Sequence, residues 1–494
     1  MNARLNGKNE EDRRVYERSA RLILLLAMRD VMPGAKVRFE HSIGLGLYMT
    51  VDGAPLTAAK VRDIEARMHE IAQADLPIKK FRWTREEAKR YFAAQGQDDT
   101  VRLLGYRPFE HFDVYTCDGL SEYFYGDMAS STGEIASFAL RFYYPGMVLL
   151  LPGEDLSGLP APFVERPQLM RTYAEANETS RILQCETAAD LNDLIAKGEI
   201  RSFIRVSEAL HERAIAHIAE RIVARGARVV FVAGPSSSGK TTFANRLSIH
   251  LRVSGKRPLA ISLDDYYIDR ERTPRDAHGN PDFECLEAID VPLFNEHLVE
   301  LLAGREVMLP RFSFKTGKRL DEGVPMRMGE DQVLIVEGIH GLNDALSEDI
   351  PSELKFRVYV SALTQLNLDN HNRIRTTDVR LLRRMVRDAR ERATEAEGTM
   401  KMWDSVRAGE EKYIFPFQER ADVMFNTSLL YEIAMLKKYA YPMLCQIAPE
   451  SPFYVRARRL VKFLNYFMDC DEEREVPPTS ILREFIGGCT FYMS

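Results

Sequence analysis

Residues 234–242, GPSSSGKTT, have the types and spacing of a phosphate-binding loop. They fit G-x-x-x-x-G-K-[ST] between an apolar run, RVVFVA, and TFANRLSIHLR, which we expect to be a strand and a helix. The glycines let the backbone curl so that amide N–H groups and a helix N-terminus face a phosphate. Lys240 is expected to reach the β- and γ-phosphates, and the Thr241 hydroxyl to bind Mg²⁺. The predicted nucleotide site is Gly234, Pro235, Ser236, Ser237, Ser238, Gly239, Lys240, Thr241 and Thr242.

Acidic residues follow two later apolar runs. In ISLDDYYIDR, Asp264 and Asp265 stand at the carboxyl end of a predicted strand, where open α/β sheets bind their ligands. A carboxylate there can take a proton from an attacking hydroxyl or reach Mg²⁺ through water. An ordinary acidic turn is the alternative. In VLIVEGIHGL, Glu337 ends another strand and is either a metal-orienting acid or a capping carboxylate.

Arginines are concentrated in RLLRRMVRDARERATEAEGT. On a helix, Arg380, Arg383, Arg384 and Arg387 share one face by i, i+3, i+4, i+7 spacing. Such a face is either solvated or closes over phosphates. Phosphoryl transfer needs arginine on the moving group, and mobile lids supply it. We therefore expect a lid.

Alternating short strands and helices from Arg228 onward predict a parallel sheet with crossover helices. Before it, helix-like 13–32 and strands ending in Asp-Gly turns predict an α+β unit. The predicted divisions are 1–155, a linker with helices at 156–205, the phosphate-loop domain at 206–440 and a helical extension at 441–494.

Composition excludes some classes of function. The 494 residues carry a net charge of −6, so no global basic field attracts nucleic acid or anionic membranes. The six cysteines form no CxxC pair, which indicates reduced thiols rather than a zinc site or a disulfide framework. The polar start and the short apolar run LILLLAM predict neither a signal peptide nor a membrane span. We expect a cytoplasmic protein.

Taken in order, SLDDYYID, PDFECLEAID, LPRFSFKTGKR, VEGIHGLN and RRMVRDARER with the loop resemble the uridine kinase and phosphoribulokinase family over about residues 228–430. The resemblance implies a P-loop kinase that phosphorylates a nucleoside 5′-hydroxyl or a comparable sugar hydroxyl, with ATP or another NTP and Mg²⁺. It implies a catalytic base at Asp264 and a metal-linked acid at Glu337. It places substrate contacts at Tyr267 and Glu284, and phosphate-clamping arginines at Arg384, Arg387 and Arg392.

Two positions depart from that family. Its uridine kinases hold the pyrimidine with an aromatic-x-aromatic-x-x-His stretch, but here Phe312 and Phe314 are followed by Gly317. A glycine side chain cannot bond a base edge, so the acceptor base stays open. Phe312 and Phe314 either stack a base or are strand core. Thr394 stands where a further lid arginine is expected.

Residues 13–155 resemble the editing domain of threonyl- and alanyl-tRNA synthetases. Its four histidine and cysteine positions read Arg18, Leu22, Phe124 and Met128 here, none of them a competent ligand or acid–base group. We expect a binding or regulatory module, or an assembly surface, without hydrolytic chemistry, and a lone structural histidine at His41. The segment KKFRWTREEAKR either contacts RNA or is a solvated face.

The leading hypothesis is therefore a nucleoside kinase of this type. A kinase for another sugar or sugar-phosphate hydroxyl, and an RNA-responsive regulatory NTPase, are the alternatives. Oligomers are common among uridine kinases, so a homo-oligomer is expected.

Overall fold

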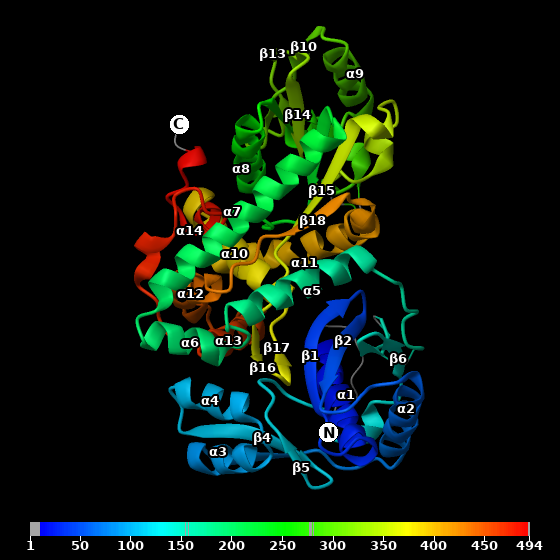
Figure 1. The fold of residues 1–494 in the computed structure, drawn as a ribbon, viewed down its shortest axis with the longest axis vertical. Helices are drawn as coiled ribbons and strands as arrows, with labels where there is room; N and C mark the ends of the chain where they lie inside the picture. Colours follow the sequence, from blue (N-terminus) through cyan, green and yellow to red (C-terminus); the bar gives the residue numbers. More distant parts are fainter. Residues whose placement is uncertain (1–9, 154, 157, 276–278, 280, 493–494) are drawn as a thin grey trace.

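The computed structural model describes residues 10–153, 155–156, 158–275, 279 and 281–492. Figure 1 shows the N-terminal region at one end of the long axis and the phosphate-loop region at the other. Helix α5 (Pro167–Ile182) crosses between them. No helix in these described ranges combines the length and apolar character needed to cross a bilayer.

The phosphate loop belongs to a parallel sheet, which the described residues build with five strands. The strand order is β18-β15-β8-β14-β9, and all neighbouring pairs run parallel. The central strand, β8, is buried along its whole length. These strands are β8 (Val229–Ala233), β9 (Arg257–Ser262), β14 (Gln332–Glu337), β15 (Lys355–Ser361) and β18 (Val423–Asn426). The predicted α/β fold with a parallel sheet is confirmed.

Helices cover this sheet. The longest, α7, ends at Gly226, whose φ of 71° allows a left-handed helix stop. Helix α8 starts directly after the phosphate loop. The helices are α7 (Ile200–Arg225), α8 (Lys240–Val253), α9 (Val291–Leu302), α10 (Thr376–Glu391), α11 (Ala396–Tyr413) and α12 (Glu432–Cys445).

Several short elements lie between β9 and β14 in the chain. They are the 3₁₀ turns η2 (Leu263–Tyr266) and η3 (Arg270–Arg272), the pair β10 (Glu306–Leu309) with β13 (Val324–Arg327), and the hairpin β11 (Phe312–Ser313) with β12 (Lys318–Arg319). They carry several of the residues expected to bind an acceptor.

The N-terminal region holds two antiparallel sheets. One has the order β1-β2-β7-β6, and the other β3-β4-β5. The predicted helix and strands are confirmed in type and place. The elements are α1 (Glu10–Val31), β1 (Lys36–Ile43), β2 (Gly46–Asp52), α2 (Ala58–Gln73), β3 (Lys79–Thr84), α3 (Arg85–Ala94), α4 (Asp98–Tyr106), β4 (His111–Cys117), β5 (Leu120–Glu122), β6 (Ala139–Tyr143) and β7 (Gly146–Leu150).

These two sheets contribute to more than one core. Side chains of α1, α2 and the first sheet form one core, which Tyr115 and Cys117 of β4 also join. Phe92 and Phe112, from the second sheet and its helices, belong to the same core as β8 and the C-terminal Tyr466. The remaining helices are α6 (Ala188–Ala196), α13 (Tyr454–Leu464) and α14 (Arg483–Ile486). The C-terminal extension therefore packs against both parts of the molecule.

A hairpin from the phosphate-loop region joins the N-terminal region (Figure 1). It consists of β16 (Asn367–Asp369) and β17 (Asn372–Arg373). The backbone N–H of Phe39 donates to the Asn370 carbonyl at 2.9 Å, and the Asn367 side chain donates to the Phe39 carbonyl at 2.9 Å. The hairpin leads directly into α10.

The first turn of α10 is also tied to the N-terminal region. The Asp378 carboxylate accepts from Arg14 at 2.8 Å and from Arg459 at 2.7 Å. Burial raises the pKa of Asp378, but these two guanidinium groups lower it by more, so its pKa lies well below its usual range. The N-terminal region thus helps to fix where α10 starts.

Candidate functional site

The phosphate loop connects β8 to α8 with the curvature that the sequence predicted. A Cβ on Gly234 would lie 1.9 Å from the Val360 carbonyl oxygen, so a larger residue does not fit there. Gly239 caps α8 with a φ of 85°, in the left-handed region that favours glycine. Ser237 also has a positive φ, 57°. The loop is therefore wound as an anion-binding concavity.

Buried arginines of α10 hold this loop from outside. Arg380 donates to the Ser236 carbonyl at 2.8 Å, and Arg383 to the Ser237 carbonyl at 3.4 Å. Arg380 and Arg383 are almost fully buried and ion-pair with Glu410 and Glu432, respectively. The expectation that this whole face forms a lid over phosphates is therefore wrong for Arg380 and Arg383. Both are structural, because acidic residues packed against α10 neutralise their charge.

The other arginines of this helix share one buried carboxylate. Asp388 lies 3.2 Å from Arg384 Nε, 3.8 Å from Arg387 Nε and 3.2 Å from Arg392 Nη1. Arg384 also donates to the Ser236 hydroxyl of the loop at 2.9 Å. Thr394, at the expected arginine position, donates its backbone N–H to the Asp388 carbonyl at 3.1 Å. The structure brings the three predicted arginines together around Asp388, and Arg384 among them contacts the loop.

Lys240, Thr241 and Glu337 meet at the start of α8. Lys240 Nζ donates to the Pro235 carbonyl at 3.3 Å, and the exposed Thr241 hydroxyl donates to Glu337 at 3.3 Å. Glu337 is the last residue of β14, as predicted. Burial raises its pKa to about 7, against the opposing effect of Lys240.

A hydroxyl and a carboxylate are hard oxygen ligands of the kind that Mg²⁺ prefers, so Thr241 and Glu337 fit that ion. The described residues contain no group of three or more His, Cys, Asp or Glu arranged for a metal.

Asp264 and Asp265 have different surroundings. Asp265 accepts the backbone N–H of Phe312 at 3.3 Å and thereby holds the β11–β12 hairpin. Asp264 stays accessible to solvent, close enough to Lys240 and Arg392 for their charges to act on it. Although Asp264 reaches solvent, the protein around its carboxylate partly desolvates it and raises the pKa of Asp264, whereas Lys240 lowers it. Asp264 is therefore within electrostatic reach of the phosphate loop, while Asp265 holds the hairpin.

Aromatic rings line the space beyond Asp264. The ring centroids of Tyr267, Phe312 and Phe314 lie 5.2–5.8 Å from one another. Glu284 lies near Arg384, Lys240 and Asp264, and burial followed by repulsion from Glu410 raises its pKa to about 7. The three predicted ring contacts thus cluster together, and Glu284 is close enough to Tyr267 for its charge to act on that residue.

Position 317 is occupied from elsewhere. Gly317 has a φ of 70°, and a Cβ built there would lie 2.7 Å from Arg270 Nε. Arg270 donates to the Phe314 carbonyl at 2.7 Å. A larger residue at position 317 would clash with the Arg270 side chain unless that side chain moved. A guanidinium group therefore lies beside position 317 and is bonded to the backbone of Phe314.

The N-terminal region contains no acid–base group at its four synthetase-like positions. Leu22 and Phe124 are fully buried core residues. Arg18 donates to the Asp127 carbonyl at 2.8 Å, and Met128 packs against the same core. His41 stacks on Tyr173 with ring centroids 3.5 Å apart, and burial lowers its pKa to about 3, which fits a structural histidine.

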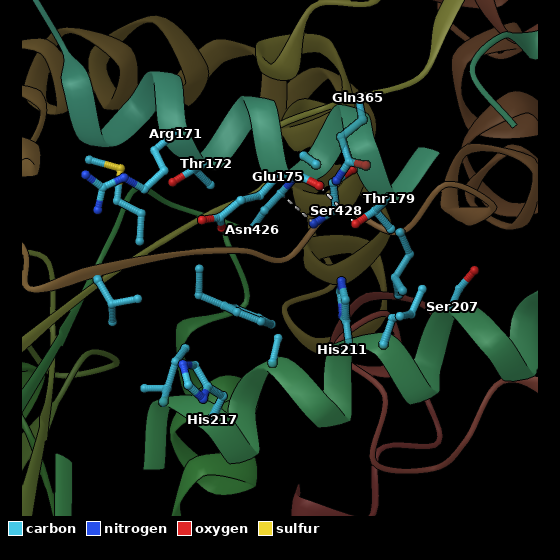
Figure 2. A pocket seen from close by; sticks show the side chains of 18 of the residues that line it. Arg171, Thr172, Glu175, Thr179, Ser207, His211, His217, Gln365, Asn426 and Ser428 are labelled. Carbon is cyan, nitrogen blue, oxygen red and sulfur yellow. Dashed lines mark hydrogen bonds between the residues drawn. The ribbon is translucent and has the colours of Figure 1, made fainter. Parts of the chain in front are cut away.

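A separate cavity of about 330 Å³ lies between α5, α7 and β18. Figure 2 shows Arg171, Thr172, Glu175 and Thr179 on α5, with Ser207, His211 and His217 on α7. None of the predicted catalytic, nucleotide or acceptor residues lines it. The residues predicted to bind the nucleotide and the acceptor therefore lie outside this cavity.

Sequence reasoning missed residues that touch the loop without a motif of their own. Thr427 donates to the Ser238 carbonyl at 2.6 Å, and Glu410 accepts the Ser236 N–H at 3.0 Å. Glu484 reaches Thr242 from the C-terminal extension. Asp388 belongs to the arginine-rich stretch, but nothing in the sequence indicated that its carboxylate is buried among three arginines.

Comparisons with known proteins agree with this geometry. Residues 229–433 match the model of the phosphoribulokinase / uridine kinase family. A uridine kinase from Halobacterium salinarum is 29% identical over 194 residues, 39% of this chain and 77% of that protein. A solved chain described as a possible uridine kinase from Bacillus stearothermophilus is 23% identical, covers 43% of this chain and 97% of its own, and has a TM-score of 0.30.

Another relative is a different kind of protein. A threonine–tRNA ligase from Symbiobacterium thermophilum is 31% identical over 182 residues, which are 36% of this chain but 26% of the ligase. The chain thus contains a domain of the phosphoribulokinase and uridine kinase family over residues 229–433, preceded by a region similar to part of a threonine–tRNA ligase.

Proposed function

We propose that the chain is a kinase that transfers the γ-phosphoryl group of ATP to a small hydroxyl acceptor, with the 5′-hydroxyl of a nucleoside as the first candidate. The observation that carries the proposal is the position of Asp264. Its carboxylate is close enough to Lys240 of the phosphate loop and to Tyr267 of the aromatic rings for the charges to act on one another. A hydroxyl compound stacked on those rings would meet both the base and the phosphate.

Each residue has a defined task in this proposal. Asp264 accepts the proton of the acceptor hydroxyl as the new O–P bond forms and the bond between the γ-phosphorus and its bridging oxygen breaks. Lys240 and the loop amides hold the β- and γ-phosphates. Thr241 and Glu337 would hold Mg²⁺, which neutralises charge on those phosphates.

The remaining polar groups act on either side of the transferred group. Arg384, Arg387 and Arg392, oriented by Asp388, stabilise charge on the moving phosphoryl group. Glu284 can bind the acceptor's other hydroxyls, and Phe312 and Phe314 can stack a base.

A sugar-phosphate acceptor is a second candidate because of Arg270. Its guanidinium lies beside Phe314 at the edge of the same space, where it can pair with a phosphate as well as with a base edge. The nucleoside candidate rests on the three rings and on the uridine kinase relatives.

The test is ADP release from Mg·ATP with a panel of nucleosides, sugars, sugar phosphates and tRNA. A Lys240→Ala preparation controls for contaminating kinases. Stimulation by a nucleoside supports the first candidate, and stimulation by a sugar phosphate the second. Silence with every small acceptor together with stimulation by tRNA would contradict the proposal and favour a regulatory NTPase.

A further inference from the structure

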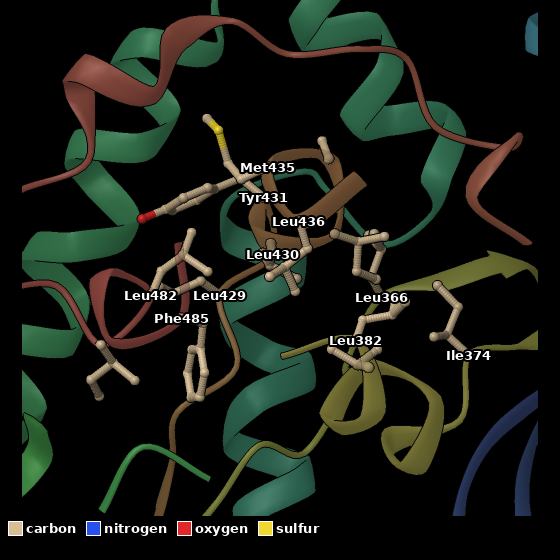
Figure 3. Close-up of a cluster of buried hydrophobic side chains, with 14 of the residues drawn as sticks. Leu366, Ile374, Leu382, Leu429, Leu430, Tyr431, Met435, Leu436, Leu482 and Phe485 are labelled. Atoms are coloured by element: carbon tan, nitrogen blue, oxygen red, sulfur yellow. The ribbon is translucent and has the colours of Figure 1, made fainter. Parts of the chain in front are cut away.

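The C-terminal segment 480–489 is seated on the phosphate loop. Ile481, Leu482 and Phe485 are fully buried around the short helix α14. Figure 3 shows Leu482 and Phe485 packed among side chains that include Tyr431 and Leu429. This apolar anchor fixes the segment against the rest of the phosphate-loop region.

The acid of this segment reaches a donor that belongs to the loop. The Glu484 carboxylate accepts from the Thr242 hydroxyl at 2.7 Å and from its backbone N–H at 3.3 Å. The first hydrogen bond within α8 runs from the Phe243 N–H to the Gly239 carbonyl. The amides of residues 240–242 therefore precede the first hydrogen bond within the helix, and phosphates bind to donors at such a helix start.

Other contacts of the segment involve the same elements. A Cβ on Gly239 would lie 2.5 Å from Ile481 Cγ2, so the segment lies directly against the loop. Arg387 lies 3.5 Å from Glu484 and 6.0 Å from the Phe485 ring centroid. Arg387 thus binds the segment while it is also one of the arginines proposed to bind a phosphate.

We propose that residues 480–489 are an autoinhibitory latch, in which the Glu484 carboxylate occupies a hydrogen-bonding position that a phosphate of the bound nucleotide needs. This inference rests on the proposed function, because it assigns regulation to the same site. An N–H makes one strong hydrogen bond, and a carboxylate at that donor repels an incoming phosphate. Nucleotide binding must therefore displace Glu484.

The test compares Mg·ATP affinity in the full chain and in Glu484→Ala by isothermal titration. Hydrogen bonds to charged groups contribute enough that we expect affinity to rise about ten- to a hundredfold. Glu472→Ala is the matched control, because Glu472 lies on the same extension, is partly exposed and pairs with Arg201 away from the loop. It should bind Mg·ATP as the unaltered chain does.

Equal or weaker affinity in Glu484→Ala would overturn the latch. If both proteins bind Mg·ATP equally well, the proposed kinase function is unaffected and only the latch fails. If neither protein binds any nucleotide, the latch and the proposed function fail together. Thermal unfolding of each variant shows whether it is folded.

A second measurement needs no substitution. Cys489 is buried and its thiol contacts the Thr242 hydroxyl. If the nucleotide displaces the latch, saturating Mg·ATP should speed alkylation of Cys489, followed by mass spectrometry, while the exposed Cys445 reacts at an unchanged rate. Slower or unchanged alkylation of Cys489 at saturation would contradict the latch.

Discussion

Asp388 gives the sharpest test of how the arginines are positioned. Its carboxylate is fully buried and forms ion pairs with Arg384, Arg387 and Arg392. The Thr399 hydroxyl lies 3.4 Å from the same carboxylate. Asp388→Asn keeps the size of the side chain and removes its charge. The three guanidinium groups then lose their common anchor and repel one another.

The contacts set the magnitude. Removing one partner of a buried ion pair costs about 3–5 kcal/mol of stability. The pair of Arg384 with Asp388 is such a buried ion pair. The Arg392 side chain is 55% exposed, so solvent screens it and its share is about 0–1 kcal/mol. We expect the free energy of unfolding to fall by about 3 kcal/mol. We expect kcat/KM to fall about ten- to a hundredfold, because the arginines are no longer held at the phosphoryl group.

Steady-state kinetics with the active acceptor, together with urea unfolding, test this prediction. A positioning role predicts a fall in kcat larger than the rise in KM for ATP, and partial recovery in Asp388→Glu. The exposed Glu391→Gln on the same helix is the control and should leave both quantities unchanged. Unaltered kcat/KM in a folded Asp388→Asn protein would refute the reasoning.

Three further predictions follow. Asp264→Asn should lower kcat by about a hundred- to ten-thousandfold with ATP affinity kept, and an unchanged single-turnover rate would remove Asp264 from the role of base. Phe314→Ala removes a ring that is 57% exposed, so it should leave stability intact and raise the KM for a nucleoside about tenfold; an unchanged KM would exclude stacking there. Burial lowers the pKa of His371, but the Glu122 carboxylate outweighs burial and raises the pKa of His371 to about 9. The ion pair between His371 and Glu122 therefore stabilises the fold fully below about pH 6.5, the pKa of an unfolded histidine, and this stability is lost as the pH rises through 9. Urea midpoints should fall over that interval and fall less in His371→Asn; parallel curves would contradict this.

The phosphate loop and its strands were predictable because local chemistry fixes them. Gly234 and Gly239 are required by backbone geometry that a short motif records, and Glu337 follows a strand whose apolar run is plain. The sequence placed Asp264 and Asp265 at a strand end. It could not predict that Asp265 holds the β11–β12 hairpin while Asp264 does not. That difference depends on Phe312, which lies 47 residues away in the chain.

The arginine helix shows where sequence patterns stop. Spacing placed Arg380, Arg383, Arg384 and Arg387 on one helix, and α10 confirms it. Which of them are structural depends on acids from α11 and α12, namely Glu410 and Glu432, whose pairing no local pattern records. The contact of Glu484 with the loop could not be predicted for the same reason, because the C-terminal extension becomes part of the site only through tertiary packing.

The N-terminal region has a physical role that its degenerate positions did not suggest. Its contacts with the β16–β17 hairpin and the Arg14–Asp378 pair hold the segment that leads into α10. The region therefore supports the helix that carries the proposed phosphate-binding arginines. Its predicted boundaries, and contact with RNA or a second copy of the chain, remain predictions.

The most direct test of the central claim follows the γ-phosphoryl group itself. The chain is incubated with γ-labelled Mg·ATP and a mixture of nucleosides, and the products are separated and identified by mass spectrometry. We predict labelled nucleoside 5′-monophosphate with the unaltered chain and none with Asp264→Asn. Label recovered as inorganic phosphate alone, whatever hydroxyl compound is added, would contradict the account.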